Sequence, residues 1–210
     1  MDAYVTREPV DRDLRRRQLA QRLVVHQART KTIFLLTGLS RHQLATLRQR
    51  WRMTDQLRRR GPTPTSFKVF RSTLRLRAEA SALAVFWRTL GNIGAANGGT
   101  PRAATALEFG ERLCEVFEAY LACFPKTELE FEHLVLLVRG LEAADAIGLS
   151  RCGSCEAVIL VDLLDLRRRL CSHCQRAADA IARARVDAHE VGEATASLPS
   201  TGEGVQQELF

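Results

Sequence analysis

The sequence predicts a mainly α-helical domain that contains a helix-turn-helix-like segment and is followed by a short segment organised by four cysteines. Apolar residues recur three and four positions apart along most of the chain, which is the period of an amphipathic helix. A Gly-Leu-Ser break at residues 38–40 separates two short helical stretches. Two Cys-x-x-Cys pairs, Cys152 with Cys155 and Cys171 with Cys174, lie near the C-terminal end. Together these three observations predict the fold class.

The N-terminal third is expected to form three helices. The first extends over Asp13–Arg29, the second over about Thr30–Thr37, and the third over Arg41 to about Met53. Gly38 breaks the helical pattern between the last two, and the Ser40 side chain can accept a hydrogen bond from the amides of the following turn. The sequence therefore predicts a capped helix start immediately after a short turn.

Two helices joined by a short turn with glycine form the pattern of a helix-turn-helix, placed here at about residues 30–50. The apolar residues spaced to pack these helices together are Ile33, Leu39, Leu44 and Leu47. In such a motif the second helix enters the major groove of DNA. Its candidate contacts are Arg41, His42, Gln43, Thr46, Arg48, Gln49 and Arg50. Phe34 stands where these motifs usually have a small residue, so a plain helical hairpin remains an alternative.

Three longer segments continue the helical pattern. One helix is expected over Phe67–Leu90 with Ser66 as its cap, after a loop at 58–65. Another starts at Pro101 and ends before Pro125, since proline suits the first position of a helix. A third extends from about Glu128 to Ile147. These helices complete a predicted helical domain over residues 1–150.

The C-terminal part is expected to hold the cysteine pairs over residues 151–189. Val158–Val161 reads as a short strand between the pairs, and a basic helix follows Cys174 to about His189. Residues 190–210 are rich in Gly, Ser, Thr and Glu and are expected to be a disordered acidic tail.

The spacing of the cysteines predicts one structural Zn²⁺ per chain, held by Cys152, Cys155, Cys171 and Cys174 in a zinc-ribbon-like segment. Fifteen residues separate the two pairs, which is typical of four-cysteine zinc sites. Four thiolates fill a tetrahedral shell and leave no position for water, so such a metal supports structure rather than chemistry. Two disulfides, a redox-active pair and an iron–sulfur cluster are the alternatives, and the ligands alone leave the cluster open.

Positive charge is concentrated in two regions. Residues 1–60 contain fifteen Arg or Lys against five Asp or Glu, whereas residues 187–210 contain five acids and no Arg or Lys. A second basic run, Arg167, Arg168 and Arg169, lies between the cysteine pairs and is a further candidate DNA contact. Arginine has forked donors that suit phosphates and guanine edges. A solvated basic face, or a genome that favours Arg codons, would give the same composition.

Several classes of protein are not expected. No apolar run is long enough to cross a membrane, and the N-terminus lacks the apolar core of a secretory signal, so a cytoplasmic location is expected. Cys114 and Cys123 would then stay reduced and act as small hydrophobic residues. The sequence has no metalloprotease, phosphate-loop or hydrolase motif. The solvated face of one helix is the reading of Glu108, Glu111, Glu115 and Glu118. The protein is therefore not expected to be an enzyme.

Five features occur in an order that resembles a known family: Thr37-Gly38-Leu39-Ser40-Arg41, then Pro64-Thr65-Ser66, then the stretch from Ala80 to Gly91, then the stretch from Tyr120 to Pro125, and finally the two cysteine pairs. Over roughly residues 15–180 the chain resembles the flagellar transcriptional activator FlhC. The turn and the four cysteines are the most specific parts of this resemblance, and none of the four zinc ligands is missing.

The resemblance implies a largely helical, non-enzymatic protein that assembles with a small helical FlhD-like protein. It further implies binding to promoter DNA of flagellar operons, with RNA polymerase as another partner. The arginine-rich N-terminus and the acidic tail do not match the family, so a diverged paralogue with other target genes is one alternative. A zinc-ribbon RNA- or ribosome-associated protein is another, because it would share the basic charge and the metal.

Overall fold

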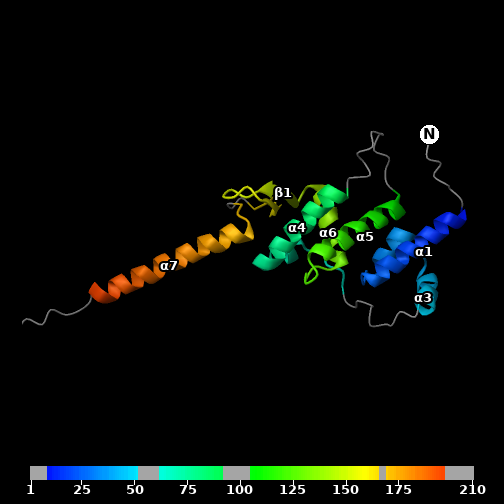
Figure 1. The fold of residues 1–210 in the computed structure, drawn as a ribbon, viewed down its shortest axis with the longest axis horizontal. Coiled ribbons are helices and arrows are strands. Elements are labelled where there is room, and N and C mark those ends of the chain that lie inside the picture. The colour runs from blue at the N-terminus through cyan, green and yellow to red at the C-terminus, as the bar shows by residue number, and fades with distance from the viewer. Residues whose placement is uncertain (1–8, 52–61, 92–104, 166–168, 197–210) are drawn as a thin grey trace, which may run out of the picture. The chain divides into compact units, whose positions relative to one another are not determined.

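The computed structural model describes residues 9–51, 62–91, 105–165 and 169–196. This part of the chain is mainly helical, with one two-stranded antiparallel sheet, which confirms the predicted fold class. The elements are α1 Pro9–Val25, α2 Thr30–Thr37, α3 Arg41–Arg50, the 3-10 helix η2 Phe67–Arg71, α4 Leu74–Leu90, α5 Ala106–Cys123, α6 Phe131–Ala143, β1 Ile147–Arg151, β2 Val158–Asp162 and α7 Ser172–Ala196 (Figure 1). The described residues up to Cys171 form one compact unit, and α7 belongs to a second.

The core of the first unit lies among α1, α2, α4, α5 and α6 (Figure 1). Leu19, Ile33 and Leu113 are fully buried there, and burial of large aliphatic side chains supplies most of the driving force for such packing. Helix α5 approaches α1 and α2 closely at Gly110. A Cβ atom at Gly110 would lie 2.7 Å from Leu19 Cδ2, so the Leu19 side chain would have to shift to admit any larger residue.

Ion pairs join α1 to α5 on the outer side of this contact. Arg15 donates to both carboxylate oxygens of Glu111 at 3.1 and 2.6 Å, and Arg22 does the same to Glu118 at 3.0 and 2.8 Å. His26 Nε2 lies 2.9 Å from Glu118 Oε1. Burial alone would raise the pKa of Glu118, but the hydrogen bonds from Arg22 and His26 outweigh it and lower the pKa. These acids therefore hold two helices together rather than forming only a solvated face.

A buried carboxylate ties α6 to the start of α2. Glu132 accepts from the Arg29 backbone amide at 2.7 Å and from Thr32 Oγ1 at 2.9 Å. Glu132 is only 2% exposed, and Thr32 is buried beside it. Because the first amides of a helix have no partner within the helix, an acceptor from a distant element caps α2.

The α2–α3 segment confirms the predicted helix–turn–helix pattern. Gly38 has φ +70°, and its amide donates to the Phe34 carbonyl at 2.8 Å. Ser40 accepts from the Gln43 amide at 3.2 Å while the Gln43 side chain accepts from the Ser40 amide at 2.8 Å, so α3 begins with a capping box. Leu39 and Leu44 are buried as predicted. Only the three residues 38–40 thus separate the two helices.

The structure corrects the expected helix over Phe67–Leu90. Ser66 caps only the short η2, and Ser72–Thr73 interrupt the helical pattern before α4 begins at Leu74. Thr73 has an extended backbone and its hydroxyl accepts from the Leu76 amide at 3.0 Å. A second capping residue therefore ends one helix and starts another, which hydrophobic spacing alone does not reveal.

The expected helix from Glu128 to Ile147 is also wrong at its end. Helix α6 stops at Ala143, Ala144 adopts a left-handed conformation, and Ile147–Arg151 forms strand β1. β1 pairs with β2 in antiparallel register, with Ile147 opposite Asp162 and Arg151 opposite Val158. The strand expected at Val158–Val161 is confirmed. Its backbone groups need hydrogen-bonding partners on a neighbouring strand, and the residues of that strand were assigned in part to the preceding helix.

Helix limits differ elsewhere by several residues. α1 covers Pro9–Val25 rather than Asp13–Arg29, because Gln27 has φ +57° and the chain turns there. α3 ends at Arg50, and α5 begins at Ala106 after a Thr105–Glu108 capping box; residues 52–61 and 92–104 lie outside the described part. α7 continues to Ala196, beyond the expected end at His189, because Val, Glu and Ala tolerate a helix despite Gly192.

Candidate functional site

The first cysteine pair lies in the loop of the β1–β2 hairpin. The Cys152 amide donates to the Ala157 carbonyl at 2.9 Å, and the Glu156 amide donates to the Cys152 carbonyl at 3.0 Å. Glu156 has φ +60°, a left-handed conformation that reverses the chain. These bonds form a tight turn that brings Cys152 and Cys155 to one end of the sheet.

The hairpin is attached to the helical core. The Leu160 amide donates to Ser81 Oγ of α4 at 3.0 Å, and both groups are buried. Arg71 of η2 pairs with Asp162 and with Asp165, the latter at 3.0 Å. Ile147 and Leu160 belong to the main hydrophobic core. A division of the chain at residue 150 passes through β1, so the hairpin and the helices share one packed unit.

The segment leading to the second cysteine pair lies against the hairpin loop. The Arg169 carbonyl accepts a hydrogen bond from the Gly153 amide at 2.8 Å, and the Arg169 guanidinium donates one to Ser150 Oγ at 3.2 Å. Arg77 of α4 donates to the Leu170 carbonyl. Cys171 is therefore delivered to the loop by contacts from both the hairpin and α4.

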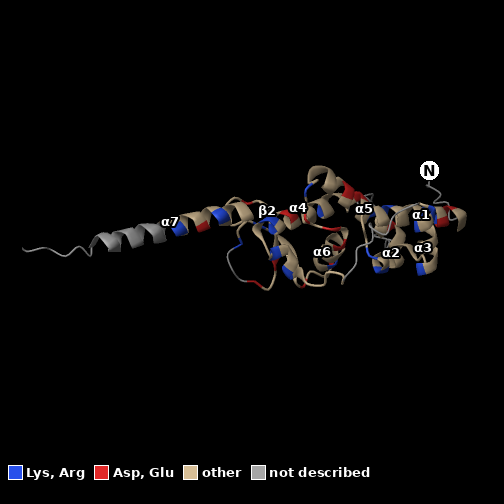
Figure 2. Cartoon of the chain, turned by 90° about the horizontal axis from the view of Figure 1, so that it is seen from below, with Lys and Arg blue, Asp and Glu red and all other residues tan. Residues whose placement is uncertain are grey.

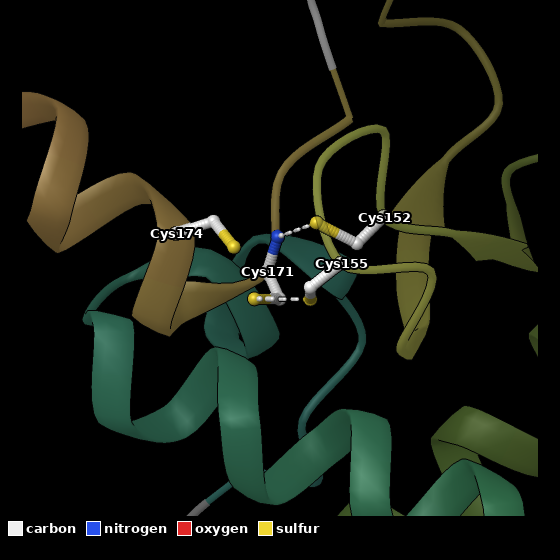
Figure 3. Close-up of side chains that lie close together, drawn as sticks. All are labelled: Cys152, Cys155, Cys171 and Cys174. Carbon is white, nitrogen blue, oxygen red and sulfur yellow. Dashed lines mark hydrogen bonds between the residues drawn. The ribbon is translucent and has the colours of Figure 1, made fainter.

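The four cysteines meet at this point (Figure 3). All four sulfur atoms lie within 4.8 Å of one another, and the sulfurs of Cys155 and Cys171 are 3.6 Å apart. A tetrahedral zinc site with Zn–S distances near 2.3 Å requires sulfurs about 3.8 Å apart. The donor set and its spacing therefore fit one metal ion bound by the predicted residues.

Backbone amides favour the charged form of the innermost thiol. Cys152 is 2% exposed, and its sulfur accepts from the Cys171 amide at 3.2 Å. This hydrogen bond, followed by that from the Cys155 amide, lowers the pKa of Cys152 to about 6. A thiolate is the form that binds a metal cation, so the amides prepare this ligand at neutral pH.

The two remaining cysteines lie away from this cluster. Cys114 is fully buried in the core, where burial raises the pKa of its thiol to about 12, in agreement with a hydrophobic role. Cys123, at the end of α5, is exposed, so the expectation that it packs as a hydrophobic residue is wrong.

The candidate DNA contacts on α3 differ in whether their side chains already take part in hydrogen bonds within the chain. Arg41, His42, Gln49 and Arg50 are exposed. Gln43 is exposed too, but its side chain takes part in the capping box, and Thr46 Oγ1 donates to the His42 carbonyl at 3.1 Å. The helix therefore offers mainly its charged and imidazole side chains to a partner.

The basic run between the cysteine pairs is described only in part. Arg167 and Arg168 lie outside the described residues. Arg169 is exposed, but both its carbonyl and its guanidinium bind the hairpin. Its role in holding the cysteine loop is structural, and sequence reasoning had considered only its charge.

Neither a search against protein-family models nor a search against curated protein sequences yields a match. No helix within the described residues is long and apolar enough to cross a membrane. The function is therefore argued from the two sites themselves.

Proposed function

We propose that this chain is the DNA-binding subunit of a transcriptional activator and contains one structural Zn²⁺. The observation that carries the proposal is the α2–α3 unit, in which a three-residue turn leads into a short, capped helix with an exposed basic face. The major groove of B-form DNA admits such a helix, and arginine can bind guanine edges there.

Zinc is the metal that best suits the cysteine site. Two Cys-x-x-Cys turns, joined by the hydrogen bond from the Cys171 amide to the Cys152 sulfur, provide four soft ligands in a closed shell. The metal would join the hairpin loop to the segment at Cys171 and stabilise a region with only two short strands. Such a site persists where thiols stay reduced, and within this proposal the protein lies in the cytoplasm.

The resemblance to FlhC refines this proposal. Within it, the chain works in a hetero-oligomer with a small helical FlhD-like protein at motility promoters and contacts RNA polymerase. Exposed large apolar residues on α1 and α2 support an assembly with another protein, and they are Val10, Leu14, Val25, Phe34 and Leu35. Apolar surface of this kind commonly lies at protein–protein interfaces.

An RNA- or ribosome-associated protein is the competing function. The deep, narrow major groove of double-stranded RNA excludes an α-helix, so α3 would then have no groove to enter. The two functions thus differ in the nucleic acid that the chain should bind more tightly, duplex DNA or RNA.

The test uses the full zinc-loaded chain, alone and co-expressed with an FlhD-like protein, and measures binding to a promoter duplex, a random duplex and single-stranded RNA. We expect the promoter duplex to bind best. Arg41→Gln should reduce the promoter preference about tenfold, as expected for loss of one base contact. The control Lys126→Gln, an exposed charge in the α5–α6 loop, should leave the preference unchanged. Tighter binding of RNA than of either duplex would contradict the proposal.

A further inference from the structure

The arginines of α1 fall into two groups. Three of them are bound to carboxylates: Arg15 and Arg22 pair with glutamates of α5, and Arg17 pairs with Asp13 of α1 at 2.5 Å. Within the part of the chain that the structure describes, Arg12 and Arg16 have no hydrogen-bond or ion-pair partner. Two guanidinium groups of one helix are thus available to an external anion.

The helical repeat places these two free arginines on the side of α1 that faces α2. Residues four apart lie above one another on a helix, so Arg12, Arg16, Ala20 and Val24 form one row. Ala20 and Val24 are buried in the core. The C-terminal part of this row is therefore buried, and its N-terminal part consists of two positive charges about 6 Å apart along the helix axis.

Arg16 reaches the turn that precedes α3. A Cβ atom built on Gly38 would lie 3.8 Å from Arg16 Nη2, and this guanidinium carbon is 4.0 Å from the same point. Arg41, the first residue of α3, follows Gly38 by three residues, which is at most about 11 Å along the chain. Arg12, Arg16 and Arg41 therefore form a basic strip from α1 past the turn to the start of α3. Figure 2 marks the Lys and Arg positions on α1 and α3.

We propose that Arg12 and Arg16 bind the phosphate backbone of duplex DNA beside the groove that α3 enters. This inference rests on the proposed function, because it assumes that α3 faces a major groove. Phosphate contacts give register and orientation without sequence information, whereas contacts to base edges give specificity. The two arginines on α1 supply the former, and the N-terminal half of α3 supplies the latter.

Free arginines distinguish this strip from the rest of the basic N-terminal region. An arginine already bound to a carboxylate must lose that partner before it binds phosphate, and it brings no net positive charge with it. Net charge over residues 1–60 therefore overstates the positive charge that α1 can offer to DNA, because Arg15, Arg17 and Arg22 are already paired with carboxylates.

The experiment compares the full zinc-loaded chain with Arg12→Gln/Arg16→Gln and with Arg12→Lys/Arg16→Lys. Binding to a fluorescein-labelled random duplex is measured by anisotropy over a series of salt concentrations. Each lost phosphate contact reduces the slope of log K against log salt by about 0.9, so the Gln variant should lose about 1.8. Its affinity should fall on the order of tenfold for random and promoter duplexes alike. The Lys variant keeps both charges and should retain most of the slope.

A matched control removes two charges elsewhere. Lys126→Gln/Arg139→Gln changes two exposed residues whose side chains form no ion pair with the described residues, and it should keep the wild-type slope. Zinc content and circular dichroism of each variant establish that the fold is intact.

The outcomes separate this inference from the proposed function. If the wild type binds duplex DNA with a salt-dependent affinity and the Gln variant has the same slope, the strip is not a phosphate site, while DNA binding by the chain stands. If the wild type binds no duplex, both ideas fail. A slope change seen with single-stranded RNA but not with duplex DNA would overturn the assignment of the strip to DNA.

Discussion

Replacement of Cys152 by Ser is expected to abolish metal binding and to unfold the segment from about residue 150 to residue 180. A structural zinc site contributes on the order of 10 kcal/mol of folding free energy, and the two short strands of the hairpin cannot replace that contribution. Ser removes one of four ligands, and Cys152 is the buried ligand that accepts an amide hydrogen bond from Cys171. Metal analysis and hydrogen exchange of the backbone amides measure the two effects.

The exchange pattern should be local. Amides of β1, β2 and the cysteine loop should lose protection, whereas those of α5, in the centre of the helical core, should keep most of theirs. Cys123→Ser is the matched control, since Cys123 is exposed and lies outside the metal cluster. A Cys152→Ser protein that retains one bound metal and native protection in the hairpin would show that Cys152 is not a ligand.

Replacement of Glu132 by Ala is expected to destabilise the helical core by about 3 kcal/mol. The substitution leaves the Arg29 amide and the Thr32 hydroxyl without their buried acceptor, and hydrogen bonds to a charged group contribute about 1.5–3 kcal/mol. The lost methylene groups of Glu132 add a smaller packing term. Urea denaturation followed by circular dichroism gives the free energy of unfolding.

Two further variants isolate the cause. Glu132→Gln keeps an acceptor of similar shape and should recover part of the lost stability. Glu142→Ala lies on the same helix at an exposed position and should change the free energy of unfolding by less than about 0.5 kcal/mol. Equal effects of Glu132→Ala and Glu142→Ala would mean that the buried carboxylate does not cap α2.

The metal site was predictable because its information is local. Each Cys-x-x-Cys pair specifies its own turn, and four thiols at this spacing leave few alternatives, so the same four residues meet in the structure. The α2–α3 turn was predictable for the same reason: Gly38 permits a left-handed backbone, and Ser40 with Gln43 forms a capping box. Each cysteine pair and the α2–α3 turn thus depend on residues at most a few positions apart, and only the meeting of the two pairs needs a longer stretch of chain.

The rest depends on residues far apart in the sequence. Glu132 caps a helix one hundred residues earlier, and no sequence pattern marks such a pair. Ile147 continues a helical spacing but belongs to a strand, because pairing of β1 with β2 decides its conformation. The arginines of α1 look alike in the sequence, and only the position of α5 separates Arg15, which binds Glu111, from Arg16, which does not.

The most direct test of the account is the metal content and coordination of the purified, reduced protein. Elemental analysis should find one zinc per chain, and X-ray absorption at the zinc edge should show four sulfur neighbours at about 2.3 Å. These values would agree with a site built from Cys152, Cys155, Cys171 and Cys174. A folded, reduced protein with almost no zinc, or with iron and inorganic sulfide in its place, would contradict the account.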